Sequence, residues 1–337
     1  MAIEGRRWVL AARPNGLPAR EDFTLERFAV PDLEDGEVLV GIEHHTVAPG
    51  VRPKLSGETY TAMVRIGEAI PGNGVGGVVA SRHPGFAAGD RVAGELAWAS
   101  HAIVRPEAIR RLDPAIFRDD IPSEAAIGVL GNAGLTAYFG LLRIGEARRG
   151  DVVLVSSASG AVGSAVGQIA RIKGCKVIGI AGSPEKCADL VDTLGFDSAI
   201  DHKAEDDIAS AVRARAPEGV DVYFDNVGGP IADAAVVNMK PHGRIAVCGQ
   251  TSGYNSTAPH GLREMTAVIT KRLTLCGFIV HDFAGEFDAA RAELAGWLHE
   301  GRLLHRPTIV EGIENSVDAF VRQFTGGGGG RPLIRVA

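Results

Sequence analysis

The pattern of hydrophobic and polar residues changes its character near residue 121. Before this point, short apolar or alternating segments such as 37–43, 74–80 and 89–94 are separated by glycine, proline and aspartate, which predicts β-strands joined by turns. After it, short apolar runs alternate with longer segments of helical periodicity. Repeated strand–helix units of this kind predict an α/β fold with a doubly wound parallel sheet.

The individual units of the second half can be placed from their periodicity and punctuation. The run 151–155 is almost wholly apolar, as expected for the centre of a parallel sheet. Further strands are predicted at 176–180, 199–200, 220–224, 244–247 and 332–336, and helices at 162–173, from 183, and at 204–214, 231–239 and 283–304.

Composition and charge exclude several classes of protein. Hydrophobic residues make up 45% and charged residues 23% of the 337 residues, as in ordinary globular proteins. The net charge is −6, and the absence of any long run of like charges argues against a nucleic-acid or membrane-surface partner. Four cysteines without a C-x-x-C pair, and an N-terminus without a signal peptide, lead us to expect a cytoplasmic protein. The uncharged stretches 125–142 and 152–170 contain too many glycines and polar residues for a membrane span.

A glycine-rich turn follows the apolar run 151–155. In it, Ala158, Gly160 and Gly163 stand at the three glycine positions of the dinucleotide fingerprint G-x-G-x-x-G. Gly160 would let the backbone approach a pyrophosphate, and Gly163 would let the helix pack tightly on the strand. The helix N-terminus would supply N–H groups for the anion. A turn that serves packing alone is the alternative, but the surrounding strand–helix units favour a dinucleotide site.

The end of the second strand bears on the choice between NADH and NADPH. An NAD site usually carries an acidic residue there, on the ribose. Here the sequence 181–186 has none at the strand end, and Ser183 and Lys186 could hold a 2′-phosphate. Ser183 could also simply cap a helix whose first residue is Pro184. We therefore expect NADPH as the cofactor.

Motifs in a characteristic order are spread over nearly the whole chain. They are Arg13-Pro14-x-Gly16-x-Pro18, Asp22-Phe23, Gly36–Val40, His83–Phe86 with Gly89–Val92, Gly134–Gly140, Ser157–Gln168, Gly182–Lys186, Phe224–Gly229, Gly243–Gly249 and Gly277–Val280. Together they resemble the zinc-independent branch of the medium-chain dehydrogenase/reductase superfamily, in particular the group of prostaglandin reductases, 2-alkenal double-bond reductases and curcumin reductases.

The resemblance implies an architecture and a reaction. A GroES-like β-barrel catalytic domain would comprise residues 1–124 and 305–337, with a Rossmann NADP-binding domain, 125–304, inserted into it. The enzyme would use NADPH to reduce the C=C bond of a small α,β-unsaturated aldehyde or ketone, by hydride transfer to the β-carbon and without zinc. A homodimer paired through edge strands at 273–280 is also implied.

The resemblance further assigns roles to individual residues. Tyr254 would contact the cofactor and donate a hydrogen bond to the substrate oxygen, on which negative charge develops. A lid or packing role is the alternative for Tyr254, and Tyr60 is a weaker catalytic candidate. The other cofactor contacts that it implies are Thr136, Ser159, Gly160, Ala161, Val162, Gly163, Ser183, Lys186, His202, Asn226, Cys248, Gly249, Phe278, Ile279 and Val280.

Four places depart from the pattern of this group. The segment Asp-Pro-Tyr-Met-Arg is here Ala48-Pro49-Gly50-Val51-Arg52, and Gly-Met-Pro-Gly is here 131–134. The tyrosine near the 2′-phosphate is His202, and an asparagine before Gly-Lys is Gly328, followed by Gly330-Arg331. These changes bear on the substrate and on some cofactor contacts.

We expect no metal site and no nucleophilic serine. No cysteine precedes Cys175, the adjacent His44 and His45 should point to opposite faces of a strand, and no Gly-x-Ser-x-Gly elbow is present. Two other functions stay open: a zinc-free NADPH-dependent carbonyl reductase or alcohol dehydrogenase, and a non-catalytic NADPH-binding protein.

Overall fold

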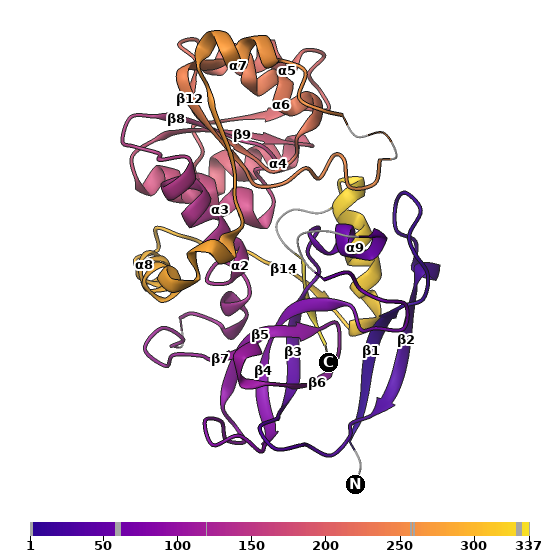
Figure 1. Cartoon of the computed structure of the whole chain (residues 1–337). Coiled ribbons are helices and arrows are strands. Elements are labelled where there is room, and N and C mark those ends of the chain that lie inside the picture. The colour runs from indigo at the N-terminus through magenta and orange to yellow at the C-terminus, as the bar shows by residue number, and fades with distance from the viewer. Residues whose placement is uncertain are drawn as a thin grey trace. The chain divides into compact units, whose positions relative to one another are not determined.

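The second part of the chain, residues 129–305, forms a unit around one parallel sheet in the computed structural model (Figure 1). The structure describes residues 3–57, 62–118, 120–256, 258, 260–327 and 332–336. The strand order is β10-β9-β8-β11-β12-β13, and every neighbouring pair is parallel. The strands are β8 (Val152–Val155), β9 (Lys176–Ala181), β10 (Ser198–Asp201), β11 (Val220–Asp225), β12 (Met239–Val247) and β13 (Thr274–Gly277). The predicted doubly wound sheet is therefore confirmed, with the apolar β8 near its centre.

Helices cover both faces of this sheet. Figure 1 shows α5, α6 and α7 on one side of β8, β9 and β12, and α2, α3 and α8 on the other side. The helices are α2 (Asn132–Phe139), α3 (Ala161–Ile172), α4 (Pro184–Ala188), α5 (Ile208–Arg215), α6 (Gly229–Val236), α7 (Met265–Lys271) and α8 (Phe287–His299). Short turns of π-helix, η4 (Gly140–Ile144) and η5 (Asp189–Thr193), continue α2 and α4, and a 3₁₀ segment, η6 (Val280–Glu286), precedes α8.

Two helices differ from the expected ranges for a local reason. Helix α5 begins at Ile208, later than the expected 204, because the side chain of Asp207 accepts a hydrogen bond from the N–H of Ser210 and caps the helix there. Helix α8 ends at His299, before the expected 304, because Gly301 adopts a positive φ of 67° that stops the helix.

The remaining residues, 1–128 and 306–337, form the other unit. Its strands form a hairpin, β1-β2, and a seven-stranded sheet with the path β14-β15-β3-β4-β5-β7, in which β6 also pairs with β3. The strands are β1 (Glu4–Leu10), β2 (Phe23–Ala29), β3 (Val38–Thr46), β4 (Pro71–Ser81), β5 (Arg91–Ala97), β6 (His101–Val104), β7 (Ile109–Arg111), β14 (Thr308–Glu311) and β15 (Pro332–Arg335). Helices α1 (Val51–Ser56) and α9 (Ser316–Thr325) and the 3₁₀ turns η1 (Arg20–Asp22), η2 (Pro106–Ala108), η3 (Ser123–Ala126) and η7 (Ile313–Asn315) accompany them.

The sheet of this unit has two ends rather than the full closure of a barrel. Among the described residues, no pairing joins β14 to β7, the two ends of the sheet path. The unit also reaches a few residues beyond the expected boundary at 124, because Ala126 and Ile127 are buried against Val75 and Leu333 in a small apolar cluster.

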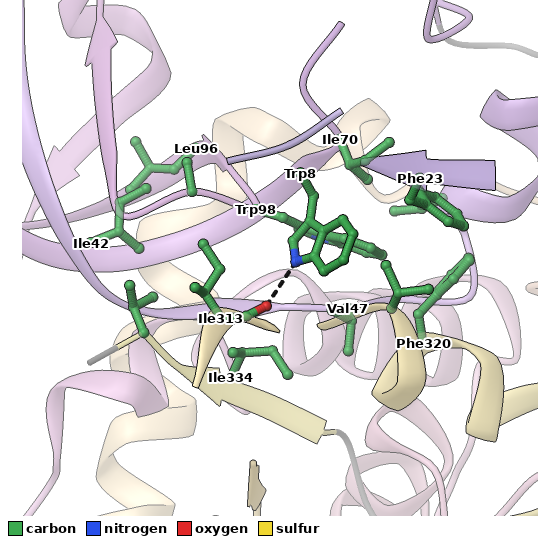
Figure 2. Packing of buried hydrophobic residues seen from close by; sticks show 14 of the residues in the cluster. Trp8, Phe23, Ile42, Val47, Ile70, Leu96, Trp98, Ile313, Phe320 and Ile334 are labelled. Carbon is green, nitrogen blue, oxygen red and sulfur yellow. Dashed lines mark hydrogen bonds between the residues drawn. The ribbon is translucent and has the colours of Figure 1, made fainter. Parts of the chain in front are cut away.

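The core of this unit joins the beginning and the end of the chain, as Figure 2 shows. Trp8, on β1, is 1% exposed, and its indole N–H donates a 2.7 Å hydrogen bond to the carbonyl of Ile313. Phe320 packs edge-on against Trp98, with ring centroids 5.4 Å apart. Burying each such side chain contributes about 1.5–3 kcal/mol, so the C-terminal segment is an integral part of the unit.

In the described parts of the chain, no helix combines the length and the hydropathy that crossing a membrane would require.

Candidate cofactor and active site

The turn between β8 and α3 needs glycine at the predicted position 163. A Cβ added to Gly163 would lie 2.3 Å from the carbonyl oxygen of Ser157 and 2.8 Å from the Cα of Ala158. Ser157 itself adopts a positive φ of 48°, which brings the chain back over the start of the helix. The helix therefore packs directly on the turn, as the fingerprint predicts.

The N-terminus of α3 offers hydrogen-bond donors. Its N-cap residue is Gly160, which has no side chain to accept from the first turn. The amide groups of Ala161, Val162 and Gly163 thus have the orientation and positive helix-dipole end that favour an anion. Ser159, half-buried, precedes them in the same turn.

Alanine at position 158 is accommodated by a glycine that sequence reasoning missed. Ala158 is fully buried, and its Cβ lies 2.9 Å from the point that a Cβ on Gly179 would occupy. Gly179 lies on β9, opposite Val155 of β8. The methyl group of Ala158 therefore fills the space that a glycine on the next strand leaves open.

The residues expected near a 2′-phosphate meet at the carboxyl ends of β9 and β10. Ser183 caps α4, since its hydroxyl accepts a 3.3 Å hydrogen bond from the N–H of Lys186. A Cβ on Gly182 would lie 2.9 Å from Nε2 of His202 and 3.4 Å from Cε of Lys203. The structure thus adds a second lysine, which the motifs did not single out, to the predicted group.

Burial and neighbouring positive charges lower the pKa values of two residues in this group. Burial lowers the pKa of Lys186, and the charge of Lys203 lowers it further. Burial also lowers the pKa of His202, and Lys203 again adds to the effect. His202 is therefore neutral at pH 7, so the lysines provide the positive charge here.

The turns after β11 and β12 are joined to the turn after β8. The side-chain amide of Asn226 donates a 2.7 Å hydrogen bond to the carbonyl of Ser156. The N–H groups of Cys248 and Gly249 donate to the carbonyl of Asp225 at 2.8 and 3.1 Å. Burial, and then the charge of Asp225, raise the pKa of the Cys248 thiol to about 12, so this cysteine is not a thiolate nucleophile.

Tyr254 lies in the loop that follows these residues. Its hydroxyl is 3.5 Å from the point that a Cβ on Gly249 would occupy, so the phenol approaches the glycine backbone at the carboxyl edge of the sheet. The loop is held there because the hydroxyls of Thr251 and Ser252 donate to the carbonyls of Asn226 and Val227, at 3.1 and 2.6 Å. The structure thus brings Tyr254 together with Asn226 and Gly249.

The other expected contacts have structural neighbours of their own. The hydroxyl of Thr136 donates 2.7 Å to the carbonyl of Asn132, one turn earlier in α2. Phe278 packs edge-on against Phe224, with ring centroids 6.3 Å apart. Ile279 follows Phe278 as the N-cap residue of the 3₁₀ segment before α8, and the buried Val280 is the first residue of that segment. Tyr60, Gly328, Gly330 and Arg331 lie outside the described residues.

The segment that departs from the expected pattern, 48–52, is anchored by its last residue. Arg52 is 3% exposed; its guanidinium donates 2.7 Å to the carbonyl of Gly16 and also contacts the hydroxyl of Ser56. This arginine therefore fixes the start of α1 against the loop before β2.

The adjacent histidines have separate neighbours within the first unit. His44 accepts from the guanidinium of Arg335 at 3.3 Å, while Nε2 of His45 lies 3.2 Å from the hydroxyl of Ser316. The ring of His45 also stacks on Trp98, and burial lowers its pKa to about 3. Within the described ranges, no cluster of three His, Cys, Asp or Glu side chains has an arrangement that could hold a metal ion.

Comparison with known proteins places this geometry in a family. Residues 6–112 match the family described as the N-terminal domain of oxidoreductase, and residues 161–296 match that described as zinc-binding dehydrogenase. The chain is 38% identical to NADPH-dependent curcumin reductase of Escherichia coli, over 98% of this chain and 97% of that protein. It is 39% identical to prostaglandin reductase 1 of Bos taurus, over 99% of both.

A solved structure agrees along the whole chain. The crystal structure of CurA from Vibrio vulnificus in complex with NADPH is 37% identical, with a TM-score of 0.92, and the match covers 98% of this chain and 99% of that one. From the ordered motifs, the parallel sheet with its glycine-dependent turn, and these nearly full-length relatives, we conclude that the chain belongs to the medium-chain dehydrogenase/reductase superfamily, in the group of the curcumin and prostaglandin reductases.

Proposed function

We propose that this protein is an NADPH-dependent reductase of the carbon–carbon double bond in small α,β-unsaturated aldehydes and ketones. The observation that carries the proposal is the edge where the β8–α3 turn, Asn226, Gly249 and Tyr254 meet, in a chain whose relatives include an NADPH-dependent curcumin reductase. We assign the unit of residues 129–305 to the cofactor and the unit of residues 1–128 and 306–337 to the substrate.

The residues at this edge fit the cofactor. The uncapped first turn of α3 would hold the pyrophosphate; Gly160, its N-cap residue, would let the backbone approach the anion, and Gly163 lets the helix pack closely on the turn. A carboxylate at the end of β9 would favour NADH by binding its ribose, but β9 ends without one. Ser183 and Lys186, which follow this strand, would instead bind a 2′-phosphate. Bound NADPH supplies a hydride ion to the β-carbon of the substrate.

Tyr254 is the residue that we assign to the carbonyl oxygen of the substrate. When the β-carbon accepts a hydride, the electrons of the C=C bond move toward that oxygen, which becomes negatively charged. A phenol hydroxyl can donate a hydrogen bond to it and so stabilises the transition state. The bonds of Thr251 and Ser252 to the turn after β11 hold the loop, so the hydroxyl is oriented before the substrate arrives.

The departure in segment 48–52 supports one other candidate function, reduction of the carbonyl group itself. Where the pattern of the related group has an acid and a tyrosine, this chain has Ala48 and Gly50, so the segment lacks an acidic and an aromatic side chain. Arg52, which the segment retains, donates a hydrogen bond to the carbonyl of Gly16.

A substrate panel distinguishes these functions. The protein is incubated with NADPH and 2-alkenals, aryl enones, 15-keto enones and the matching saturated ketones, and the products are identified. We expect saturated aldehydes or ketones from the enals and enones. Turnover of the saturated ketones alone would establish the carbonyl reductase, and tight NADPH binding without turnover would indicate a binding protein.

We also propose that the protein is a cytoplasmic homodimer that pairs through β13. This strand ends the sheet, and an unpaired edge is a template for pairing with a second copy. Leu275 on β13 is 38% exposed, and Met265 and Ile269 on the neighbouring α7 are 51% and 71% exposed. The four cysteines are unpaired, which suits a reducing compartment. Light scattering should give a dimer for the wild type and a monomer for Leu275→Lys; a monomeric wild type would refute the pairing.

A further inference from the structure

A buried carboxylate lies where the sheet reverses its strand order. From β8 the chain proceeds to β9 and β10 on one side and then crosses to β11, β12 and β13 on the other. The gap between the carboxyl ends of β8 and β11 is therefore the topological switch point, at which open α/β sheets bind their ligands. Asp225, the last residue of β11, lies at this point and is 5% exposed.

One oxygen of Asp225, Oδ1, accepts hydrogen bonds from neutral groups on all sides. The hydroxyls of Tyr223 and Ser156 donate to it, at 2.8 and 3.2 Å. The backbone N–H groups of Val227 and Gly228 donate to it at 3.0 and 2.9 Å. None of these four partners is a cation. A buried charge is costly unless hydrogen bonds satisfy it, so the carboxylate strongly favours the arrangement that brings these donors together.

The same residue connects the three turns to which the cofactor contacts are assigned. Ser156, which donates to Asp225, begins the turn after β8 and accepts a 2.9 Å hydrogen bond from the N–H of Asn226. The carbonyl of Asp225 accepts from the N–H groups of Cys248 and Gly249, after β12. Removing the charge of Asp225 would thus loosen the turns after β8 and β11 directly, and that after β12 through the backbone.

We propose that Asp225 is a positioning residue of the cofactor site: its buried carboxylate holds the turns after β8, β11 and β12 in the conformation that binds NADPH. The inference rests on the proposed function, since it concerns the same site. Turns that are ordered before binding do not have to be ordered by the ligand, and this raises affinity. This contribution to affinity should be the same for NADPH and NADH, because the three turns would contact parts that both cofactors share. None of the three turns belongs to the group around Lys186, where the 2′-phosphate of NADPH would lie.

The chain contains a matched control on the same strand. The carboxylate of Asp221 accepts a 2.8 Å hydrogen bond from the N–H of Val152, on β8. It also forms an ion pair with the ammonium group of Lys240, at 2.7 Å. It therefore also connects β11 to β8, but near the amino ends of these strands. Asp221→Asn perturbs the same strand pair without touching the three turns.

The test compares dissociation constants for NADPH and NADH, measured by calorimetric titration well below the unfolding midpoint of each variant. Asp225→Asn preserves size and an acceptor oxygen but removes the charge, and we expect it to weaken both cofactors in the same proportion, by about tenfold, the loss of one charge-assisted hydrogen bond. Asp221→Asn should lower the unfolding midpoint and leave both constants unchanged. Ser156→Ala, which removes the link between the carboxylate and Asn226, should weaken both cofactors as well and replaces Asp225→Asn if that variant does not fold.

If Asp225→Asn binds both cofactors with the affinity of the wild type, the positioning role is overturned. The same holds for Ser156→Ala if it is used in place of Asp225→Asn. An equal loss in Asp221→Asn would overturn it too, because the effect would then be one of general stability. A wild type that does not bind NADPH would instead refute the proposed function, so the two failures are distinguishable.

Discussion

Gly163→Ala tests the connection between the glycine-rich turn and cofactor binding. The added methyl carbon would lie 2.3 Å from the carbonyl oxygen of Ser157 and 2.8 Å from the Cα of Ala158. Both neighbours are backbone atoms, so neither can rotate away, and the turn itself must move. Gly167→Ala is the matched control one helical turn later in α3: the nearest atoms to its Cβ would belong to the side-chain ring of Phe196 rather than to the backbone.

The magnitudes of the two substitutions are similar for stability and different for binding. Inserting a methyl group into a packed site costs about 1–3 kcal/mol, and the higher helix propensity of alanine returns up to about 1 kcal/mol. Each variant should therefore lose about 0–3 kcal/mol of unfolding free energy, a range that follows from these two values. Only Gly163→Ala displaces the amide groups that we assign to the pyrophosphate, and losing one hydrogen bond to a charged group weakens binding by about tenfold or more.

The assay pairs urea unfolding with the quenching of intrinsic fluorescence by NADPH. We expect a lower unfolding free energy than that of the wild type for both Gly163→Ala and Gly167→Ala, and a raised dissociation constant for Gly163→Ala alone. Wild-type affinity in Gly163→Ala, or an equal loss in Gly167→Ala, would refute the connection between this turn and the cofactor.

Three further predictions concern single side chains. Lys186→Ala should raise KM for NADPH by about tenfold, as for a lost contact of about 1.4 kcal/mol, and leave KM for NADH unchanged. Lys176→Ala, at the amino end of β9, is the control. An equal rise of KM for both cofactors in Lys186→Ala would show that Lys186 only supports the fold. Tyr254→Phe should lower kcat by about tenfold to a hundredfold, with a smaller change in KM, because a donor to the developing negative charge is lost; an unchanged kcat would reduce Tyr254 to packing. The pKa of His45, lowered by burial to about 3, means that the unfolded chain binds a proton below about pH 6.5 while the folded chain does not. As the pH is lowered from about 6 to about 4, this residue should reduce the unfolding free energy by about 1.4 kcal/mol per pH unit. Urea titrations of His45→Gln at several pH values should show a shallower dependence of unfolding free energy on pH. An equal dependence in the wild type and the variant would contradict the lowered pKa of His45.

Local signals predict the backbone of the candidate site where it depends on neighbours in the sequence. The apolar run before the turn, the spacing of Gly160 and Gly163, and the Ser183–Pro184 start of a helix each act within a few residues. The capping role of Asp207 is equally local, and it moves the start of α5 from the expected residue 204 to Ile208.

The parts that could not be predicted depend on the register between distant strands. Ala158 is tolerated because Gly179 lies beside it on β9, and Lys203 lies near Lys186 and His202 because β10 ends beside β9. The bonds of Asp225 to Ser156 need β8 and β11 to be neighbours. Periodicity gives the face of a strand but not its partner, so these contacts needed the three-dimensional structure.

The pairing of β15 with β3 has a consequence for the order in which the chain folds during synthesis. Every residue of the unit 129–305 is available once position 305 has left the ribosome, and this unit can complete its contacts at that stage. The other unit has been synthesised as far as residue 128 much earlier, and β3 can already pair with β4 and β6. It lacks its third neighbour, β15, and Trp8 lacks the carbonyl of Ile313, until residues 306–337 emerge. The half-sheet formed by the first residues therefore has to wait, with an apolar face uncovered, while the rest of the chain is made, and this interval is when the nascent protein most needs protection by chaperones.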